Sequence, residues 1–376
     1  MECAKLTEVS FLIWSKSQDH HPRKVTCKLK IVFDGFWWRE GPISNRTVMV
    51  EFIEAWSTSY PEDKIFVVTT WGSKIESYRN ITFISLPRIP HPIFNLMFLS
   101  LIARFLKTDA VVAHNFPAIH KKSGVFIHDF IFIDHPQWFS GTERAYFSLM
   151  KPLNNFFAKL VFTSSKTEAS RIRMSLQVPI SVCPLGVRSS LKSTIGVPPP
   201  ALQQTTQGFY LTVGRNNPRK NIDALLQAYC NSSKIAALPK MVVVGSLDEE
   251  SLQRLDGFCN QNRILVIPKV TDSELAWLYQ NTSLFVFPSL DEGFGMPILE
   301  ALYFNSKMLL SDIEVFHEVS QGIALFVNSK SLLELSQALI NAQEDKQRFP
   351  QVNMELNVFG WLNAVHGMRS AIIEFG

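Results

Sequence analysis

Short apolar runs, each followed by a polar loop or by a stretch with helical spacing, recur along most of the chain. The runs are apolar at consecutive positions, which is typical of strands that are buried on both faces of a parallel α/β sheet. In the first half the pattern predicts strands at 28–34, 64–70, 81–86, 109–115, 124–129 and 159–165, and helices over 48–56, over 93–106 and from Ser165.

The pattern stops at GVPPPALQQTTQG (196–208), which is rich in Pro, Gln and Thr and carries no charge. We interpret 196–207 as an interdomain linker. The pattern then restarts, which indicates a second domain. Strands are predicted at 209–214, 241–245, 263–268, 284–289 and 307–312, and helices from Asn221, over 249–259, over 272–280 and from Met296.

We therefore expect an α/β fold with two doubly wound domains in tandem and a ligand between them, at the carboxyl ends of the strands. The first domain would span 28–195 and the second 208–357, with 1–27 as an N-terminal extension. The composition agrees, because 46% hydrophobic and 19% charged residues exclude a disordered or fibrous chain.

The sequence predicts neither a membrane span nor a secretory signal. The longest apolar stretch, 93–106, is interrupted by polar residues and is shorter than the roughly 18 residues of a spanning helix. The N-terminus carries Glu2, Lys5 and Glu8 and lacks an apolar core followed by a cleavage site. Five scattered cysteines without a C-x-x-C pair indicate reduced thiols in a cytoplasmic protein.

The two halves of the chain differ in charge. Residues 1–196 hold 24 Lys and Arg against 15 Asp and Glu, whereas 197–376 hold 13 against 18. A basic half suits a domain that faces an anionic partner, such as a membrane surface or a phosphorylated lipid, and an ordinary solvated surface is an equally open interpretation. Nucleic acid ranks lowest, because the basic residues are dispersed and no nucleic-acid-binding motif is present.

Two motifs carry candidate chemistry. In VGRNNPRKNID (213–223), Arg215 and Lys220 flank a turn between a predicted strand and a helix, where two cations could converge on one anion. In PSLDEGFGMPILEAL (288–302), Glu292 lies in a glycine-containing loop and Glu300 in the following helix. A continuous helix would separate these carboxylates by about 12 Å, too far for the pair of a retaining glycosidase. We expect them to bind separate parts of a polyhydroxylated ligand.

These motifs resemble the large GT-B family of retaining glycosyltransferases often called family 4. EGFGMPILE resembles the E-x7-E signature of that family, and Arg215 with Lys220 resembles its R-x4-K diphosphate-binding pair. The stretch 263–289 also resembles the segment that leads into E-x7-E. The similarity is strong over 208–345 and looser over 28–190.

The resemblance implies a role for each matching residue. Arg215 and Lys220 would bind the donor diphosphate, Glu292 the transferred sugar and Glu300 the ribose. The backbone at Gly293, Phe294 and Gly295 would approach sugar and phosphate, and Lys269 and Val270 would contact the base. In the first domain, His128 would face the donor sugar, and Gly41 would stand in the loop on the acceptor side. The catalytic residues implied are Glu292, His128, Arg215 and Lys220.

The resemblance also implies a retaining displacement without cofactor or metal, because Arg and Lys serve the diphosphate. The histidines lack the spacing of metal ligands, so we predict no metal site. After Glu300 the chain departs from the usual Cys-Gly-x-Pro turn, and Asn305 would replace the glycine in the left-handed conformation. The apolar helix predicted over 358–375 would pack back on the first domain.

The function expected is sugar transfer from a nucleotide sugar, with mannose or a deoxyhexose on GDP as donor, in the synthesis of a bacterial surface polysaccharide such as O-antigen, capsule or exopolysaccharide. The acceptor would be a polyprenyl-diphosphate-linked or oligosaccharide chain, reached by peripheral contact at the inner face of the plasma membrane. Two alternatives stay open: a catalytically silent partner protein that binds nucleotide sugars, and a GT-B nucleotide-sugar epimerase.

Overall fold

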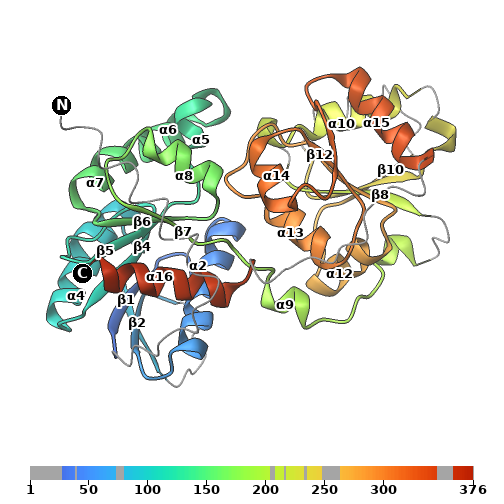
Figure 1. The fold of residues 1–376 in the computed structure, drawn as a ribbon. Helices are drawn as coiled ribbons and strands as arrows, with labels where there is room; N and C mark the ends of the chain where they lie inside the picture. The colour runs from blue at the N-terminus through green and yellow to red at the C-terminus, as the bar shows by residue number, and fades with distance from the viewer. Residues whose placement is uncertain are drawn as a thin grey trace, which may run out of the picture.

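The computed structural model describes residues 28–38, 40–72, 80–203, 208–215, 217–232, 235–247, 263–344 and 359–375. The predicted extension 1–27, the predicted helix over 249–259 and the part of the predicted linker at 204–207 lie outside these ranges. Within them the chain forms two parallel sheets with helices around each, so the α/β, doubly wound fold is confirmed (Figure 1).

The first sheet has the strand order β3-β2-β1-β4-β5-β6-β7, and every pairing in it is parallel. Its strands are β1 (Lys30–Gly35), β2 (Lys64–Thr70), β3 (Ile81–Leu86), β4 (Ala110–His114), β5 (Ser123–Phe126), β6 (Leu160–Thr163) and β7 (Ile180–Val182). Six of these were predicted from apolar runs. The edge strand β7 was not, because its three residues are only half-buried and form no apolar run.

The helices of the first half cover both faces of this sheet. They are α2 (Ile43–Ser59), α3 (His91–Ile93), the π-helical turn η1 (Phe94–Leu99), α4 (Ser100–Phe105), α5 (Ile131–Asp134), η2 (Pro136–Trp138), α6 (Gly141–Ser148), α7 (Met150–Phe157) and α8 (Lys166–Arg173). Two further short elements, α9 (Ser189–Lys192) and η3 (Pro200–Leu202), belong to the segment that crosses to the second half. One face packs against α2, and the opposite face packs against η1, α4 and α7.

The second sheet has the order β10-β9-β8-β11-β12-β13 and is also parallel throughout. Its strands are β8 (Phe209–Val213), β9 (Lys240–Val244), β10 (Ile264–Ile267), β11 (Leu284–Phe287), β12 (Met308–Ser311) and β13 (Leu325–Val327). The helices are η4 (Pro218–Lys220), α10 (Ile222–Cys230), η5 (Ile235–Ala237), α12 (Asp272–Asn281), α13 (Met296–Tyr303), α14 (Glu314–Ser320) and α15 (Leu332–Glu344).

The turn after α13 uses asparagine where a glycine is usual. Asn305 has a φ of 56°, in the left-handed region that asparagine tolerates better than most residues. Its backbone N–H donates to the carbonyl of Leu302 and so closes the end of the helix. The conformation predicted for Asn305 is therefore confirmed.

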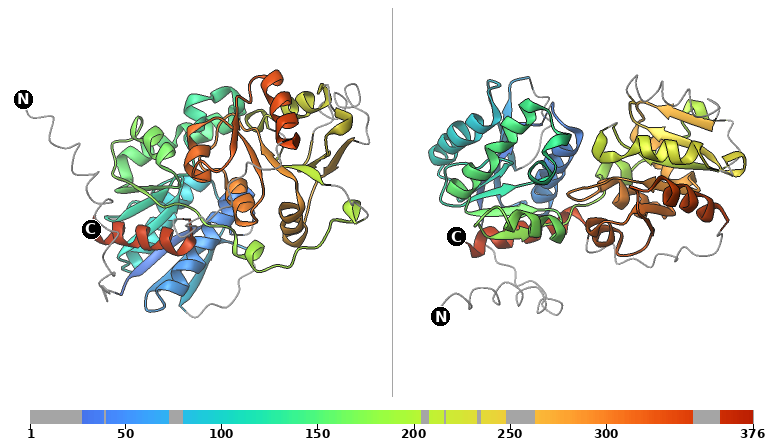
Figure 2. Two further views of the ribbon diagram at one scale, coloured as in Figure 1. Left: turned by 45° about the vertical axis from the view of Figure 1, so that its right-hand side comes forward. Right: turned by 90° about the horizontal axis from the view of Figure 1, so that it is seen from above.

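The last helix, α16 (Trp361–Glu374), lies on the first half, against α2 and β7 (Figures 1 and 2). Arg369 of α16 is 4% exposed and donates from Nε and Nη2 to the buried carboxylate of Asp63. Asp63 also accepts from the backbone of Leu29 and from the indole of Trp56. The indole of Trp361 donates to the carbonyl of Val187, which fixes the other end of the helix.

The two halves meet through polar contacts from α8. The Glu318 carboxylate of α14 accepts from the backbone N–H groups of Lys166 and Thr167, at the start of α8. Arg171 of the same helix donates from Nη2 to both oxygens of Asp291, at 2.9 and 2.8 Å. The halves therefore touch at the carboxyl ends of their strands, where the sequence pattern places a ligand.

We expect Arg369→Met to lower the free energy of unfolding by about 3–5 kcal/mol, because it leaves the Asp63 carboxylate buried without its charged partner. Urea denaturation followed by circular dichroism measures the change. Arg144→Met on the exposed side of α6 is the matched control and should unfold like the wild type. Equal stability of the two variants would contradict the structural role of this pair.

Candidate active site

The loop between β8 and α10 brings three cations to the carboxyl edge of the second sheet. The side chain of Asn217 accepts from the backbone of Arg219 at 2.9 Å and so begins the turn η4. Asn221 then takes a left-handed conformation, with a φ of 55°, and α10 starts. The backbone N–H of Leu290 donates to the carbonyl of Arg219 at 2.7 Å, which ties this loop to the one after β11.

Glu292 lies between two of these cations. Its Oε1 forms an ion pair with Nζ of Lys220, and its Oε2 lies 3.6 Å from Nη1 of Arg219. Burial alone would raise the pKa of this carboxyl, but Arg219 and Lys220 outweigh burial and hold the pKa below its ordinary value. Glu292 is therefore a buried carboxylate held ionised by its neighbours.

Lys220 is placed by the same contacts. Its ammonium lies 4.8 Å from the ring centroid of Phe287, on β11, which is a cation–π distance. Burial lowers the pKa of Lys220, and the Glu292 carboxylate opposes that shift. The Arg215 side chain is exposed, and its charge also reaches Lys220 and lowers that pKa.

The loop of Glu292 is pressed against the first half at Gly293. A Cβ atom on Gly293 would lie 2.5 Å from the carbonyl oxygen of His128 and 2.9 Å from Cβ of Asp129, so only glycine fits there. The hydroxyl of Ser165 donates to the carbonyl of Gly293 at 2.7 Å. Asp129 also lies 3.7 Å from Nη1 of Arg219. The structure thus brings His128, Glu292 and Lys220 into one neighbourhood at the junction.

His128 follows β5 by two residues, so the predicted strand over 124–129 ends earlier than expected. Its Nε2 is buried and has no hydrogen-bond partner among the described residues. The ring stacks on that of His114, with centroids 5.9 Å apart. Burial and the neighbouring His114 lower the pKa of His128 to about 3, so the imidazole is neutral at physiological pH.

Glu300 has a separate set of partners, as expected for a carboxylate with its own role. Arg188 donates from Nε to Oε1 at 2.9 Å, and the Tyr279 hydroxyl donates to Oε2 at 3.0 Å. Nη1 of Arg188 also donates to Asp272 at 2.8 Å. Burial raises the pKa of Glu300, whereas Arg188 and the two hydrogen bonds oppose the rise.

Arg188 sits on the segment that crosses from the first half to the second. The next residue, Ser189, donates from its backbone and its hydroxyl to the carboxylate of Glu51 on α2, at 2.6 and 2.7 Å. Adjacent residues of the crossing segment therefore hold one carboxylate in each half.

The other predicted residues occupy the surroundings of this centre. Phe294 is buried, and Gly295 has a φ of 92° directly before α13. Lys269 and Val270 follow β10; the lysine is exposed and the valine half-buried. Gly41 has a φ of 143° and lies against the ring of Trp37, within its own loop.

Sequence reasoning missed Arg219, Arg188, Tyr279 and the ion pair of Arg171 with Asp291. Arg219 adjoins Lys220 and could have been found from the run of cations in NNPRKN. Nothing in the local sequence marks the other three, because each partner lies in a distant segment. In the part of the chain that the structure describes, no group of three His, Cys, Asp or Glu side chains could hold a metal ion.

Comparison with known proteins gives a family for the second half. Residues 199–351 match the family model described as "Glycosyl transferases group 1". The match lies in the second half and covers less than half of the chain. Together with the mannosyltransferase relatives and the similar solved structure described next, it shows that the protein is a glycosyltransferase with the GT-B fold. Assignment to family 4 stays an expectation.

The chain is similar to the O-antigen chain mannosyltransferase RfbU of Salmonella typhimurium, at 26% identity over 264 residues, which cover 66% of this chain and 71% of RfbU. It is also similar to the serotype-specific mannosyltransferase WbdA of Escherichia coli, at 29% identity over 168 residues. That match covers 42% of this chain and 21% of WbdA, so the chain spans a small part of that relative.

Among solved structures, the fold is similar to that of WaaG, a glycosyltransferase involved in lipopolysaccharide biosynthesis. The TM-score is 0.64 at 14% identity, with 91% of this chain and 95% of that chain covered. At 14% identity the similarity shows that the fold is shared, and the aligned region includes both sheets of this chain.

We expect Gly293→Ala to keep the two halves apart. The added methyl group would clash with the backbone carbonyl of His128, and neither backbone segment can move without disturbing its own half. Small-angle X-ray scattering should show a larger radius of gyration than in the wild type. Gly141→Ala, where a Cβ atom has nothing within 4 Å, should leave the radius unchanged. A compact Gly293→Ala variant would contradict the close contact.

Proposed function

We propose that this glycosyltransferase is a retaining hexosyltransferase that uses a nucleoside-diphosphate sugar, with GDP-mannose as the first candidate. The observation that carries the proposal is the Glu292 carboxylate, held ionised between Lys220 and Arg219 beside His128 and the start of α13. The mannosyltransferase names of RfbU and WbdA support the choice of sugar.

The donor diphosphate would bind to Arg215, Lys220 and the amides that precede α13. A helix N-terminus and two or three cations supply the positive potential that a leaving nucleoside diphosphate needs. Arg219 adds a cation that the sequence motif does not include. Glu292 would accept hydroxyls of the transferred sugar, and His128, as a neutral imidazole, would hydrogen-bond to the same sugar through Nε2. Lys269 and Val270 would contact the base.

Glu300 would bind the ribose with Arg188 and Tyr279 behind it. Both of its oxygens already accept one hydrogen bond, and each keeps a further lone pair for a ribose hydroxyl. In this arrangement Arg188 is a positioning residue that orients Glu300 and favours its ionised form.

The chemistry follows from these groups. The bond between the anomeric carbon and the diphosphate oxygen breaks, and the cations and amides stabilise the charge that develops on the leaving group. The acceptor hydroxyl attacks the same face of the oxocarbenium-like sugar and gives its proton to the leaving phosphate. No metal is needed, since Arg and Lys serve the diphosphate, and no cofactor enters the reaction.

The acceptor would be a polyprenyl-diphosphate-linked or oligosaccharide chain of a bacterial surface polysaccharide, with O-antigen suggested by the printed name of RfbU. The enzyme would act at the cytoplasmic face of the membrane, in peripheral contact with it. No helix among the described residues is long and apolar enough to cross a bilayer.

The first experiment is a donor panel with UDP-, GDP-, dTDP- and ADP-sugars, scored by thermal shift and by nucleotide release in the presence of membrane lipid extract. We expect saturable binding and release with one donor. Arg215→Ala and Glu292→Ala should each lower the rate of nucleotide release by a factor on the order of 10²–10³, because each removes a preorganised charge. Arg144→Ala is the surface control.

The same panel tests the two rival functions. Saturable binding without release under any condition would indicate a silent nucleotide-sugar-binding protein. Conversion of the donor sugar without an acceptor would indicate an epimerase, although the low pKa of His128 makes this residue a poor proton donor or acceptor.

A second prediction concerns pH. In Arg188→Met the arginine no longer opposes the burial of Glu300, so the pKa of Glu300 rises above its already raised value. Donor binding that needs the carboxylate should then weaken at a higher pH than in the wild type as the pH is lowered. Calorimetric titration with the nucleoside diphosphate at a series of pH values measures the shift, with Arg46→Met as control. Identical pH profiles would rule out the positioning role.

A further inference from the structure

Exposed apolar side chains are concentrated in the first half. Of the sixteen large apolar side chains that are exposed among the described residues, nine lie between 93 and 174, whereas 209–344 contributes only Leu333. Scattered apolar residues on a surface need no explanation, but a contiguous group of them marks an interaction site.

Four of the nine form one stripe along the helix from His91 to Phe105. They are spaced four residues apart, and their exposed fraction rises from 44% at the first to 85% at the last: Ile93, Met97, Leu101 and Phe105. The inner side of the same helix is fully buried on the sheet through Phe94, Leu99 and Ala103. A helix that is apolar on both sides is expected to be covered on both sides.

The stripe continues onto neighbouring elements. The hydroxyl of Ser100 accepts from the backbone N–H of Ile119 at 2.7 Å, so the loop before β5 lies against α4. From there a surface cavity of about 260 Å³ leads to α7. It is lined by Ile119, His120, Lys121, Phe156, Phe157 and Lys159. Phe156 is 76% exposed. We call the stripe, Ile119 and this cavity the outer apolar surface.

The segments of the outer apolar surface are rich in cations. Residues 91–125 and 149–160 hold six Lys and Arg but only one acidic residue, Asp109. The Asp109 carboxylate accepts from the backbone of Lys30. The surface therefore combines exposed aromatic and aliphatic groups with positive charge.

We propose that the outer apolar surface docks on an anionic lipid bilayer. Apolar side chains of a surface helix enter the interface to a depth of about 5–10 Å, and Lys and Arg beside them bind anionic headgroups. A second copy of this chain fits less well, because a twofold contact would bring two cationic surfaces together.

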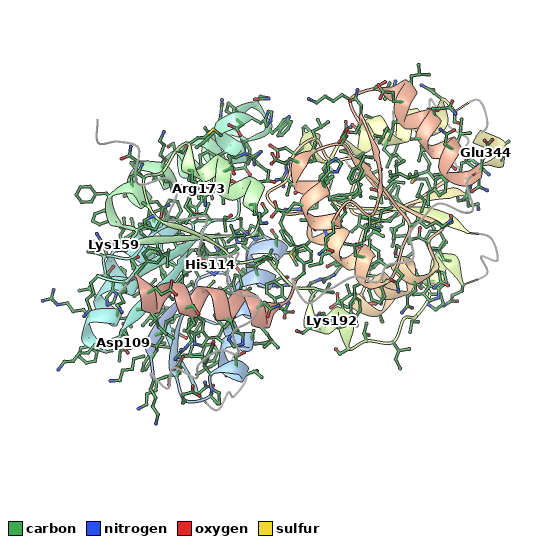
Figure 3. The ribbon with its side chains drawn as sticks, in the orientation of Figure 1. Asp109, His114, Lys159, Arg173, Lys192 and Glu344 are labelled. Atoms are coloured by element: carbon green, nitrogen blue, oxygen red, sulfur yellow. The ribbon has the colours of Figure 1, made fainter. Side chains whose placement is uncertain are left out.

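The placement suits a lipid-linked acceptor, and in this respect the inference rests on the proposed function. The helix begins at His91, whose imidazole contacts Asp34 near the carboxyl end of β1, and ends just before β4. It therefore runs along the strands, with one end near the edge that faces the second half. Its other end, in α4, lies with α7 on the side away from the second half, where Lys159 is labelled (Figures 1 and 3). If this helix lay flat on the bilayer, the junction between the two halves would lie beside the membrane surface and would open parallel to it.

The test is co-sedimentation of the full chain with vesicles of phosphatidylcholine alone, or of phosphatidylcholine and phosphatidylglycerol in equal parts. We expect binding to the anionic vesicles that weakens with added salt. Leu101→Ser with Phe105→Ser should lower the partition coefficient about tenfold or more, since two apolar groups are lost from the interface. Lys121→Glu with Lys159→Glu should also lower it and reduce its salt dependence.

Matched controls come from the second half. Leu333→Ser, where the leucine is 80% exposed, and Lys240→Glu should bind vesicles like the wild type. Unchanged vesicle binding of the Leu101→Ser, Phe105→Ser double variant would overturn the proposal. Failure of the wild type to bind either kind of vesicle would also overturn it. Light scattering that shows a dimer dissociated by this variant would make the stripe a subunit interface instead.

Transfer of sugar to a detergent-solubilised acceptor separates this inference from the proposed function. It should be unchanged in the Leu101 and Phe105 variant, because the substitutions lie outside the candidate active site. Vesicle binding without any transfer by the wild type would overturn the proposed function and leave the docking surface in place.

Discussion

The contact of Gly293 with the backbone of His128 decides how the two sheets of this protein face each other. Backbone meets backbone there, without a side chain between them, so the loop that carries Glu292 reaches the end of β5 in the other half. The ion pair of Arg171 with Asp291 and the contacts of Glu318 with the start of α8 lie around it. Because the carboxyl ends of parallel strands bear the loops, this one contact gathers residues from both sheets into a single centre.

Charge balance within that centre explains why two glutamates of one short motif behave differently. Glu292 has two cations beside it, which more than offset its burial, whereas Glu300 has one arginine and a phenol, which do not. The first is held as a carboxylate by direct charge. The second depends on Arg188, which belongs to the crossing segment, and so its ionisation depends on how that segment is seated between Glu51 and Asp272.

Most of the fold was predictable from the sequence because buried parallel strands are apolar at every position. The two strands that the pattern did not predict, β7 and β13, are edge strands of three residues each, and most of these residues are only half-buried. Helices α5 to α7 were not predicted because each is short and few of their side chains are buried. Within the candidate site, Glu292, Glu300 and Lys220 could be found from local motifs. Arg188 could not, because it lies 112 residues from Glu300 and only the fold brings them together.

The pairing of Arg369 with Asp63 has a consequence for the order in which the chain can fold as it is synthesised. The two residues are 306 positions apart, so Asp63 leaves the ribosome long before its buried partner exists. Everything that forms the second sheet, up to Val327, is made in the interval. The half that is translated first is thus completed last. Until α16 arrives, α2 and β7 keep an uncovered apolar face, and this interval is when a nascent chain of this protein most needs protection from aggregation.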